Sequence, residues 1–337
     1  QVSVDDYGRK DTGRWRLNAS ADAAGITGSG DRLTANLTHS EGNLLNFGGL
    51  TYSLPLGAPG ARLTASYSQS KYRVTGPVFG PLELSGSSKN GNLTYLYPEI
   101  RSRTESLYFG VGLDHAGGRS DVKGQTVSGS QINLLQLIAN YTLFHEDGSA
   151  LFLNGGVDTN LHVNDNAQSS QEFARLNVGG GYLKPLGGQW TLFTRGGAQW
   201  SPDPLADTEK YSLGGPDNVR GFNSAEARGD SGVFLSFELQ RTLAPAWPLT
   251  AGGFVESGKV WSKRFLTPLP ACVPNLFSDC VTPAEAHTLT SVGVELLFQS
   301  EDKRWNSRLQ WAYAVGGTKP ADGNELGHIW LSVGMSF

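Results

Sequence analysis

Apolar and polar side chains alternate along this chain with a period of two residues, and this alternation constrains the fold most. It recurs in segments such as 106–113, 232–240 and 327–337. Side chains of a β-strand point alternately to its two faces, and a tilted strand of about ten residues can cross a bilayer. The pattern therefore predicts an all-β protein, although a β-sandwich that buries one face would show the same alternation.

Composition narrows the fold class further. The chain has 337 residues, of which 44 are glycine, 10% are aromatic and only 17% are charged, which is too apolar and aromatic for a disordered chain. A formal net charge of −4 gives no electrostatic basis for binding nucleic acid. Since the sequence contains no run of about 18 apolar residues, a membrane-spanning helix is excluded, whereas a transmembrane barrel is compatible with it.

Aromatic residues at the ends of the apolar faces favour the membrane barrel over the sandwich. They are Tyr182, Trp190, Trp200, Phe298 and Trp305. Aromatic side chains gather in this way at the two interfaces of a transmembrane barrel. We therefore expect the apolar faces of the strands to contact lipid.

We expect a transmembrane antiparallel β-barrel of 16 strands, formed as one domain over residues 1–337. The strands are predicted near 1–6, 13–22, 31–39, 44–54, 61–72, 88–97, 104–115, 131–144, 149–160, 172–184, 189–200, 232–243, 249–260, 287–298, 305–315 and 327–337. An even number of strands places both ends of the chain on one side, with short turns such as 55–60, 145–148 and 185–188. The longest connections, 201–231 and 261–286, then lie on the other side, and pairing of the last strand with the first leaves no open edge.

The long connection 201–231 contains the first candidate functional motif, Val219, Arg220, Gly221 and Phe222. A loop of this length is commonly functional, and one arginine among apolar residues indicates a folded tip with an anchored cation. The alternative is a solvated turn in which the arginine has no special role.

A second candidate motif lies on the strand predicted at 249–260. Its alternation turns Phe254, Glu256 and Gly258 toward the barrel lumen, where a carboxylate could receive an arginine from a loop. The alternative is that Glu256 is one more hydrated lumen charge. Other charges expected to be of that kind are Glu238, Glu295, Arg175, Arg195 and Arg308.

These two motifs carry a resemblance to a known family. The stretch LGGPDNVRGFNSAEARGDSGVFLSFEL, residues 213–239, resembles the sixth extracellular loop and following strand of two-partner secretion transporters. The family's loop motif VRG(F/Y) matches Val219–Phe222, and its Phe-x-Asp-x-Gly motif matches Phe254–Gly258 with Glu256 in place of the aspartate. The opening of the chain resembles the start of the same barrel, and Phe337 resembles the terminal signal for insertion into the outer membrane.

The resemblance implies a bacterial outer-membrane pore that exports one large partner protein of the toxin, adhesin or haemolysin type without ATP. It implies a sixteen-stranded barrel with its sixth loop folded into the lumen and Arg220 paired with Glu256. The family's periplasmic POTRA domains and plug helix are not expected within these residues. A monomer is expected, surrounded by outer-membrane lipid and inserted by the barrel-assembly machinery. The first alternative is a barrel-assembly or insertase factor that uses a weak seam between the first and last strands, and the second is a diffusion porin.

Two further predictions concern covalent and cofactor chemistry. Cys272 and Cys280 lie in a proline-rich segment and are predicted to form a disulfide, the alternative being two free thiols. The six histidines lack the spacing of zinc ligands, and no G-x-S-x-G motif occurs, so neither a cofactor nor an enzyme is expected. A Ser/His site of a barrel lipase, assembled across strands, would escape such a motif search.

Overall fold

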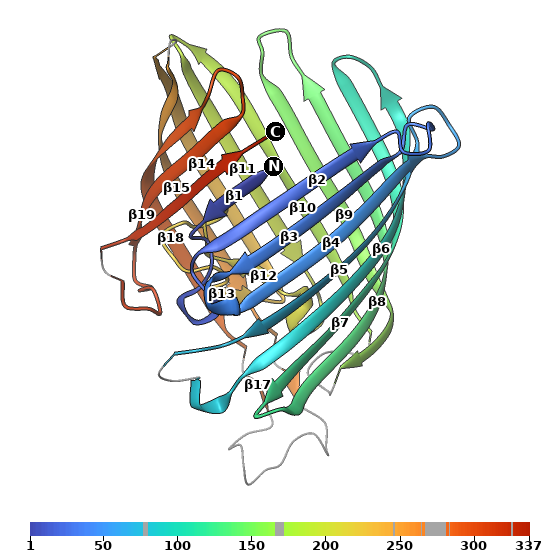
Figure 1. Cartoon of the computed structure of the whole chain (residues 1–337), viewed down its shortest axis with the longest axis vertical. Helices are drawn as coiled ribbons and strands as arrows, with labels where there is room; N and C mark the ends of the chain where they lie inside the picture. The colour runs from blue at the N-terminus through green and yellow to red at the C-terminus, as the bar shows by residue number, and fades with distance from the viewer. Residues whose placement is uncertain are drawn as a thin grey trace.

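The computed structural model forms a closed antiparallel β-barrel of sixteen strands, with the first and last strands paired (Figure 1). It describes residues 1–76, 80–165, 172–244, 247–263, 265–266, 281–282, 284–324 and 326–337. The barrel strands are β1 (Val2–Asp5), β2 (Arg16–Ala24), β3 (Arg32–Ser40), β4 (Leu45–Pro55), β5 (Arg62–Arg73), β6 (Ser85–Arg101), β7 (Glu105–Val122), β8 (Gln125–Phe144), β9 (Ala150–Asp165), β10 (Ala174–Gly187), β11 (Trp190–Trp200), β14 (Ser231–Ala244), β15 (Trp247–Trp261), β18 (Ala286–Gln299), β19 (Trp305–Val315) and β20 (His328–Met335). The predicted fold class and all sixteen strands are thereby confirmed.

Short elements occupy several connections. They are the two-stranded sheets β12 (Tyr211–Leu213) with β13 (Ala227–Gly229) and β16 (Phe265–Leu266) with β17 (Val281–Thr282), and the 3-10 turns η1 (Lys10–Thr12), η2 (Glu41–Asn43), η3 (Gly80–Leu82) and η4 (Asp207–Glu209). Within the described residues no helix is long and apolar enough to cross a membrane. The connection 201–230 between β11 and β14 is called loop six below.

The barrel closes through a short seam, because β1 has only four residues. Val2 pairs with Met335 and Asp5 with Ser332, so the two ends of the chain lie side by side. Beyond the strand, the backbone N–H of Leu331 donates to the Asp6 carboxylate at 2.7 Å. Both termini therefore lie on the side of the short turns, as predicted. Outer-membrane barrels place short turns toward the periplasm and longer loops toward the exterior, which orients the molecule.

The strands β6 to β9 are longer than predicted on the side of the long loops. The expected loop between 115 and 131 is instead a continuation of β7 and β8 to a two-residue turn at Lys123–Gly124. Its sequence is rich in Gly, Ser and charged residues, so the apolar alternation ends although backbone pairing continues. Apolar alternation therefore marks only the part of a strand that faces lipid. It does not mark the part that extends beyond the membrane into water.

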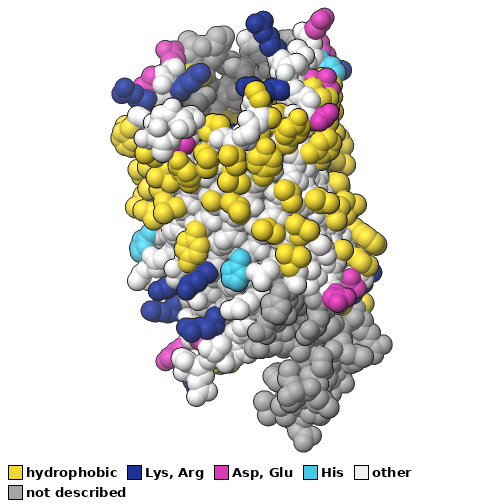
Figure 2. Space-filling view, turned by 90° about the vertical axis from the view of Figure 1, so that its right-hand side faces the viewer, with side chains coloured by type: hydrophobic (Ala, Val, Ile, Leu, Met, Phe, Trp, Pro, Cys, Tyr) yellow, Lys and Arg dark blue, Asp and Glu magenta, His cyan; other side chains and the backbone are white. Residues whose placement is uncertain are grey.

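The outer face carries the apolar side chains. In the predicted alternating segments these residues are widely exposed, from Phe109 at 48% to Val233 at 43% and Ile329 at 53%. On the face of the barrel seen in Figure 2, hydrophobic side chains form a band, with charged side chains beyond both of its edges. Trp190, Trp200 and Trp305 are exposed at strand ends, where interfacial aromatics are expected. The apolar band is the surface that contacts hydrocarbon.

Candidate functional site

Loop six folds into the lumen and anchors there through Arg220. Its guanidinium donates to Glu256 Oε1 from Nε at 3.0 Å, to Glu238 Oε2 at 2.8 Å and to Glu295 Oε2 at 3.1 Å. Its backbone N–H donates to Glu256 Oε2 at 2.8 Å. One side chain of the loop is thus bound to three neighbouring strands, β14, β15 and β18.

Strand alternation and register bring these three carboxylates together. Glu238 pairs with Phe254, two residues from Glu256, and Glu295 pairs with Gly252. Since Val255 is 45% exposed on the outer face, Phe254 and Glu256 point inward as predicted and are buried. The face of Phe254 lies 3.3 Å from Arg220 Cζ, measured to the ring centroid, so the guanidinium also has a cation–π partner.

Burial makes this cluster dependent on complete pairing. Arg220 and Glu256 are each 1% exposed, and Glu238 and Glu295 are also buried. Glu256 additionally accepts from Arg195 at 3.1 Å and from the Ser236 hydroxyl at 3.2 Å. Removing one member of a buried ion pair leaves an uncompensated charge, which costs far more than the net worth of the pair. The arrangement therefore fixes where the loop sits.

Three residues expected to be hydrated lumen charges belong instead to this cluster. Glu238 and Glu295 are bound directly to Arg220, and Arg195 is bound to Glu256. The expectation of hydrated charges was wrong for both glutamates, because the docked loop excludes water from them. The alternation along each strand places Glu238 and Glu295 on the lumen face. Only the register between the strands shows that both carboxylates converge on Arg220.

The other motif residues hold the loop tip against the wall. Val219 and Phe222 are fully buried in an apolar cluster with Leu213, Val260 and Leu289. This cluster gives the tip a core of its own on the inner surface of β15 and β18, separate from the polar anchor. The apolar and charged residues of the motif thus act on different neighbours.

Gly221 and Gly258 are required by close approach. A Cβ on Gly221 would lie 2.8 Å from Ser291 Cβ and 2.8 Å from the backbone nitrogen of Ala314. A Cβ on Gly258 would lie 2.8 Å from the Leu213 side chain. Gly221 of loop six has no room for a side chain against the barrel wall, and Gly258 of the wall has none against the loop. Each glycine therefore permits close contact between loop and strand.

Trp330 is a contact that the sequence analysis did not identify. Its indole N–H donates to the carbonyl of Arg220 at 2.7 Å, and its ring packs edge-on against Tyr7, which follows β1. The Ser224 hydroxyl donates to the carbonyl of Tyr7 at 3.3 Å. Loop six therefore also contacts the strands that close the barrel. The sequence signal for this contact is a tryptophan at a lumen-facing position of the last strand.

A second anchor holds the start of loop six on β9 and β10, and β11 separates these strands from β14 of the first anchor. Arg175 of β10 lies 2.6 Å from a carboxylate oxygen of Glu209 and 2.7 Å from Asp158 of β9. Nearby, Leu205 and Ala206 pack with Ile132, Leu134 and Phe173. Arg175 was expected to be a hydrated charge, and its side chain is largely buried instead.

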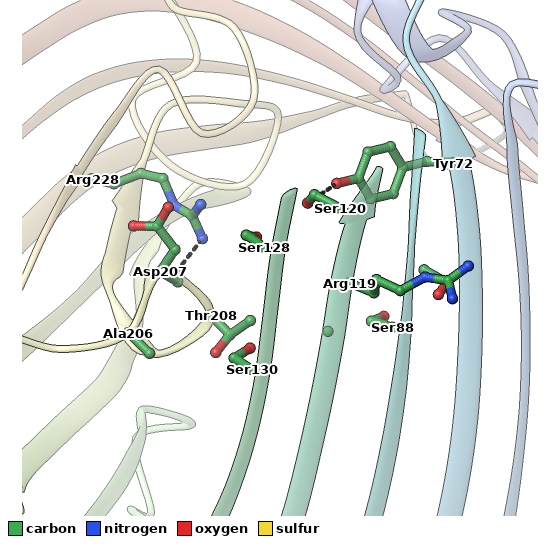
Figure 3. A pocket seen from close by; sticks show the side chains of 12 residues that line it. Tyr72, Ser88, Arg119, Ser120, Ser128, Ser130, Ala206, Asp207, Thr208 and Arg228 are labelled. Atoms are coloured by element: carbon green, nitrogen blue, oxygen red, sulfur yellow. Dashed lines mark hydrogen bonds between the residues drawn. The ribbon is translucent and has the colours of Figure 1, made fainter. Parts of the chain in front are cut away.

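Between this part of loop six and the wall of β5–β8 lies a cavity of about 250 Å³ (Figure 3). Thr208 and Asp207 face it from the loop, while Tyr72, Ser88 and Ser130 face it from the wall. The Tyr72 hydroxyl is hydrogen-bonded to Ser120 at 3.2 Å. Hydroxyl groups thus line the space that the loop leaves open.

The remaining predicted residues lie elsewhere. Cys272 and Cys280 fall outside the described residues, so their disulfide stays a prediction. Phe337 follows β20 and is 90% exposed, and its role in insertion likewise stays a prediction. In the part of the chain that is described, no cluster of His, Cys, Asp and Glu has the arrangement of a metal site.

Comparison with known proteins places the chain in a family. A model described as "Haemolysin secretion/activation protein ShlB/FhaC/HecB" matches residues 1–266. The chain belongs to this family. That membership confirms the resemblance to two-partner secretion transporters and the predicted location in the bacterial outer membrane.

Individual relatives agree with this assignment. The chain is 27% identical over 352 residues to the heme/hemopexin transporter protein HuxB of Haemophilus influenzae (strain 86-028NP), covering 100% of this chain and 59% of the relative. It is 27% identical over 272 residues to the outer membrane transporter CdiB of Dickeya dadantii (strain 3937), covering 75% of this chain and 47% of the relative. The chain therefore spans about half the length of these relatives.

Solved structures show the same fold. CdiB from Escherichia coli superposes with a TM-score of 0.81 at 20% identity, covering 100% of this chain and 62% of that chain. BamA from Haemophilus ducreyi superposes with a TM-score of 0.66 at 17% identity, covering 100% and 69%. The barrel architecture is thus shared with both kinds of protein, and the higher score belongs to the transporter.

Proposed function

We propose that this barrel is the protein-conducting part of a two-partner secretion transporter, which exports one large partner protein across the outer membrane. The observation that carries the proposal is loop six, anchored inside the lumen by Arg220 on three buried glutamates. A pore for small solutes needs only a hydrated lumen with fixed charges. A loop with its own apolar core and two anchors is suited to restrain a large opening.

The wall that faces loop six supports passage of a polypeptide. Between the outward residues of β5 and β6, such as Tyr67 and Leu93, the inward positions carry mostly hydroxyl and amide groups. They include Ser66, Ser68, Ser70, Ser88, Asn90, Asn92 and Thr94. These groups can exchange hydrogen bonds with an extended backbone, and they carry no charge that would hold it. We infer that the exported chain moves along this wall, beside loop six.

Export in this scheme needs no ATP, because folding of the partner outside the cell removes it from the pore. Among the relatives, HuxB is named a heme/hemopexin transporter protein and CdiB an outer membrane transporter. ShlB of Serratia marcescens is named a hemolysin transporter protein. By analogy we propose a secreted partner of the haemolysin, toxin or adhesin type. We further propose that the barrel works as a monomer in lipid and that Phe337 is read by the barrel-assembly machinery.

The second candidate function is barrel assembly, and one observation favours it. The seam between β1 and β20 contains only four residue pairs, and BamA shares the architecture. Against it, Trp330 and Tyr7 connect the seam to the docked loop. Opening the seam would therefore also disturb the loop.

Comparative mass spectrometry of culture medium and outer membranes, with and without the gene for this chain, tests the proposal. We expect one very large protein to disappear from the medium while other outer-membrane barrels stay constant. A joint fall of many barrels would instead show an assembly factor, and an unchanged medium would contradict export.

A further inference from the structure

The outer face of the barrel carries an apolar groove that continues into a basic pocket. The groove, of about 830 Å³, lies over β2–β5, and the pocket, of about 400 Å³, lies at the ends of β5–β7 on the long-loop side. Asn46 and Lys71 line both. The two hollows are therefore neighbouring parts of one amphipathic surface, which transport through the lumen does not use.

Small side chains hollow the groove. Its lining includes the small residues Ala19, Ala35 and Gly48 together with Leu37 and Tyr67, which are 62% and 52% exposed. Because Leu37 and Tyr67 are outward-facing apolar residues, the groove opens toward hydrocarbon. Its shape suits a flexible acyl chain.

The apolar surface ends at one level of the barrel. His39 pairs with Asn46 across β3 and β4, and their side chains are hydrogen-bonded at 2.7 Å. Lys71 pairs with the same Asn46 from β5. The outward residues thus change from apolar to polar within one step along each strand, which marks the interface of the outer leaflet.

Cations cluster just beyond this level. Lys71 of β5 and Arg119 of β7 both pair with Ser87 of β6, the strand between them, so the two cations lie at the same level of the barrel. Both line the pocket together with Arg73. Arg119 is ion-paired to Asp121 at 3.1 Å, whereas Lys71, Arg73 and Lys89 have no ion pair within the described residues. Figure 2 shows a group of Lys and Arg side chains on this side of the apolar band. Since three of these four cations have no ion pair among the described residues, the surface keeps an excess of positive charge that attracts an anion at this level of the membrane.

We propose that this surface binds the phosphorylated glycolipid of the outer leaflet, the lipid A part of lipopolysaccharide. The phosphates lie against Lys71 and Arg73, and an acyl chain lies in the groove over Ala35 and Gly48. Charge complementarity and position select this ligand, because the pocket faces the exterior and the groove faces hydrocarbon. Basic pockets beside an apolar surface recognise anionic lipid headgroups in the same way.

Native mass spectrometry of the purified barrel in detergent tests the proposal. The probes are bisphosphorylated lipid A and the same lipid with both phosphates removed. We expect the phosphorylated lipid to be retained, and the variant Lys71→Gln/Arg73→Gln to bind it at least about tenfold more weakly. Ala35→Phe, which fills the groove, should weaken binding of both lipids.

The matched control is Arg101→Gln/Lys184→Gln, which removes two exposed cations on the short-turn side. It should bind lipid A like the parent, and heat-dependent migration on gels verifies that every variant is folded. Equal retention of the two lipids, or an equal loss in the control, would overturn the proposal. Secretion does not enter this assay, so its result is independent of the proposed transport function.

Discussion

Replacing Arg220 with methionine should release loop six from the lumen while the barrel stays folded. The methionine side chain keeps much of the volume and removes the charge that Glu238, Glu256 and Glu295 share. Breaking a buried ion pair from one side costs about 3–5 kcal/mol. The carboxylates can regain water only if the loop leaves the lumen. The substitution therefore destabilises the docked state of the loop by this amount.

The reporter for release is a single cysteine at Ala227, in a background in which Cys272 and Cys280 are serine. Ala227 lies in loop six and is buried, and cysteine is only slightly larger. If labelling by a maleimide requires the loop to open, about 3–5 kcal/mol corresponds to an increase in the labelling rate of about 10²- to 4 × 10³-fold. The increase in the labelling rate cannot exceed the factor that corresponds to the free energy of docking the loop in the parent protein.

Arg195→Met is the control for this experiment. Arg195 also binds Glu256, but it belongs to the wall, and its side chain is 27% exposed. It should raise the labelling rate much less. Labelling of the Arg220→Met variant within about twofold of the parent would refute the reasoning, because the arginine would then not hold the loop.

Three further variants or treatments test separate contacts. Gly221→Ala should loosen loop six, since its Cβ would meet the wall within 2.8 Å, and it should raise labelling of the same reporter cysteine. Glu209→Gln should weaken the second anchor by removing the carboxylate beside Arg175, and limited proteolysis should then cut the start of loop six faster; an unchanged digestion pattern would exclude that anchor. Cys272 and Cys280 should resist alkylation until a reductant is added, and a mass shift for two labels without reductant would show free thiols.

The barrel could be predicted from the sequence because a single local signal repeats in every strand. Alternation reports directly which residues face lipid, so Val255 and Glu256 were assigned to opposite faces correctly. The same signal fails beyond the apolar band, where the outward positions of β7 carry His115, Gly117 and Arg119 while its backbone pairing with β8 continues. The length of those strands was therefore underestimated.

The site could be predicted only in part, since its geometry depends on strand register. The motifs in loop six and β15 identified Arg220 and Glu256, which the structure brings together. Glu238 and Glu295 become neighbours only through the pairing of β14, β15 and β18, and burial by the loop then changes their character. A single sequence does not encode register locally, so their part in the anchor could not be seen.

The most direct test of the central claim is site-specific photocrosslinking in cells that export the partner protein. A photoreactive amino acid at Ser88, which faces the cavity beside loop six, is compared with one at Tyr67, which is exposed on the outer face. We predict crosslinks to one large secreted protein from position 88 and none from position 67. Crosslinks to that protein from the outer position alone, or crosslinks from either position to other barrels, would contradict conduction through this lumen.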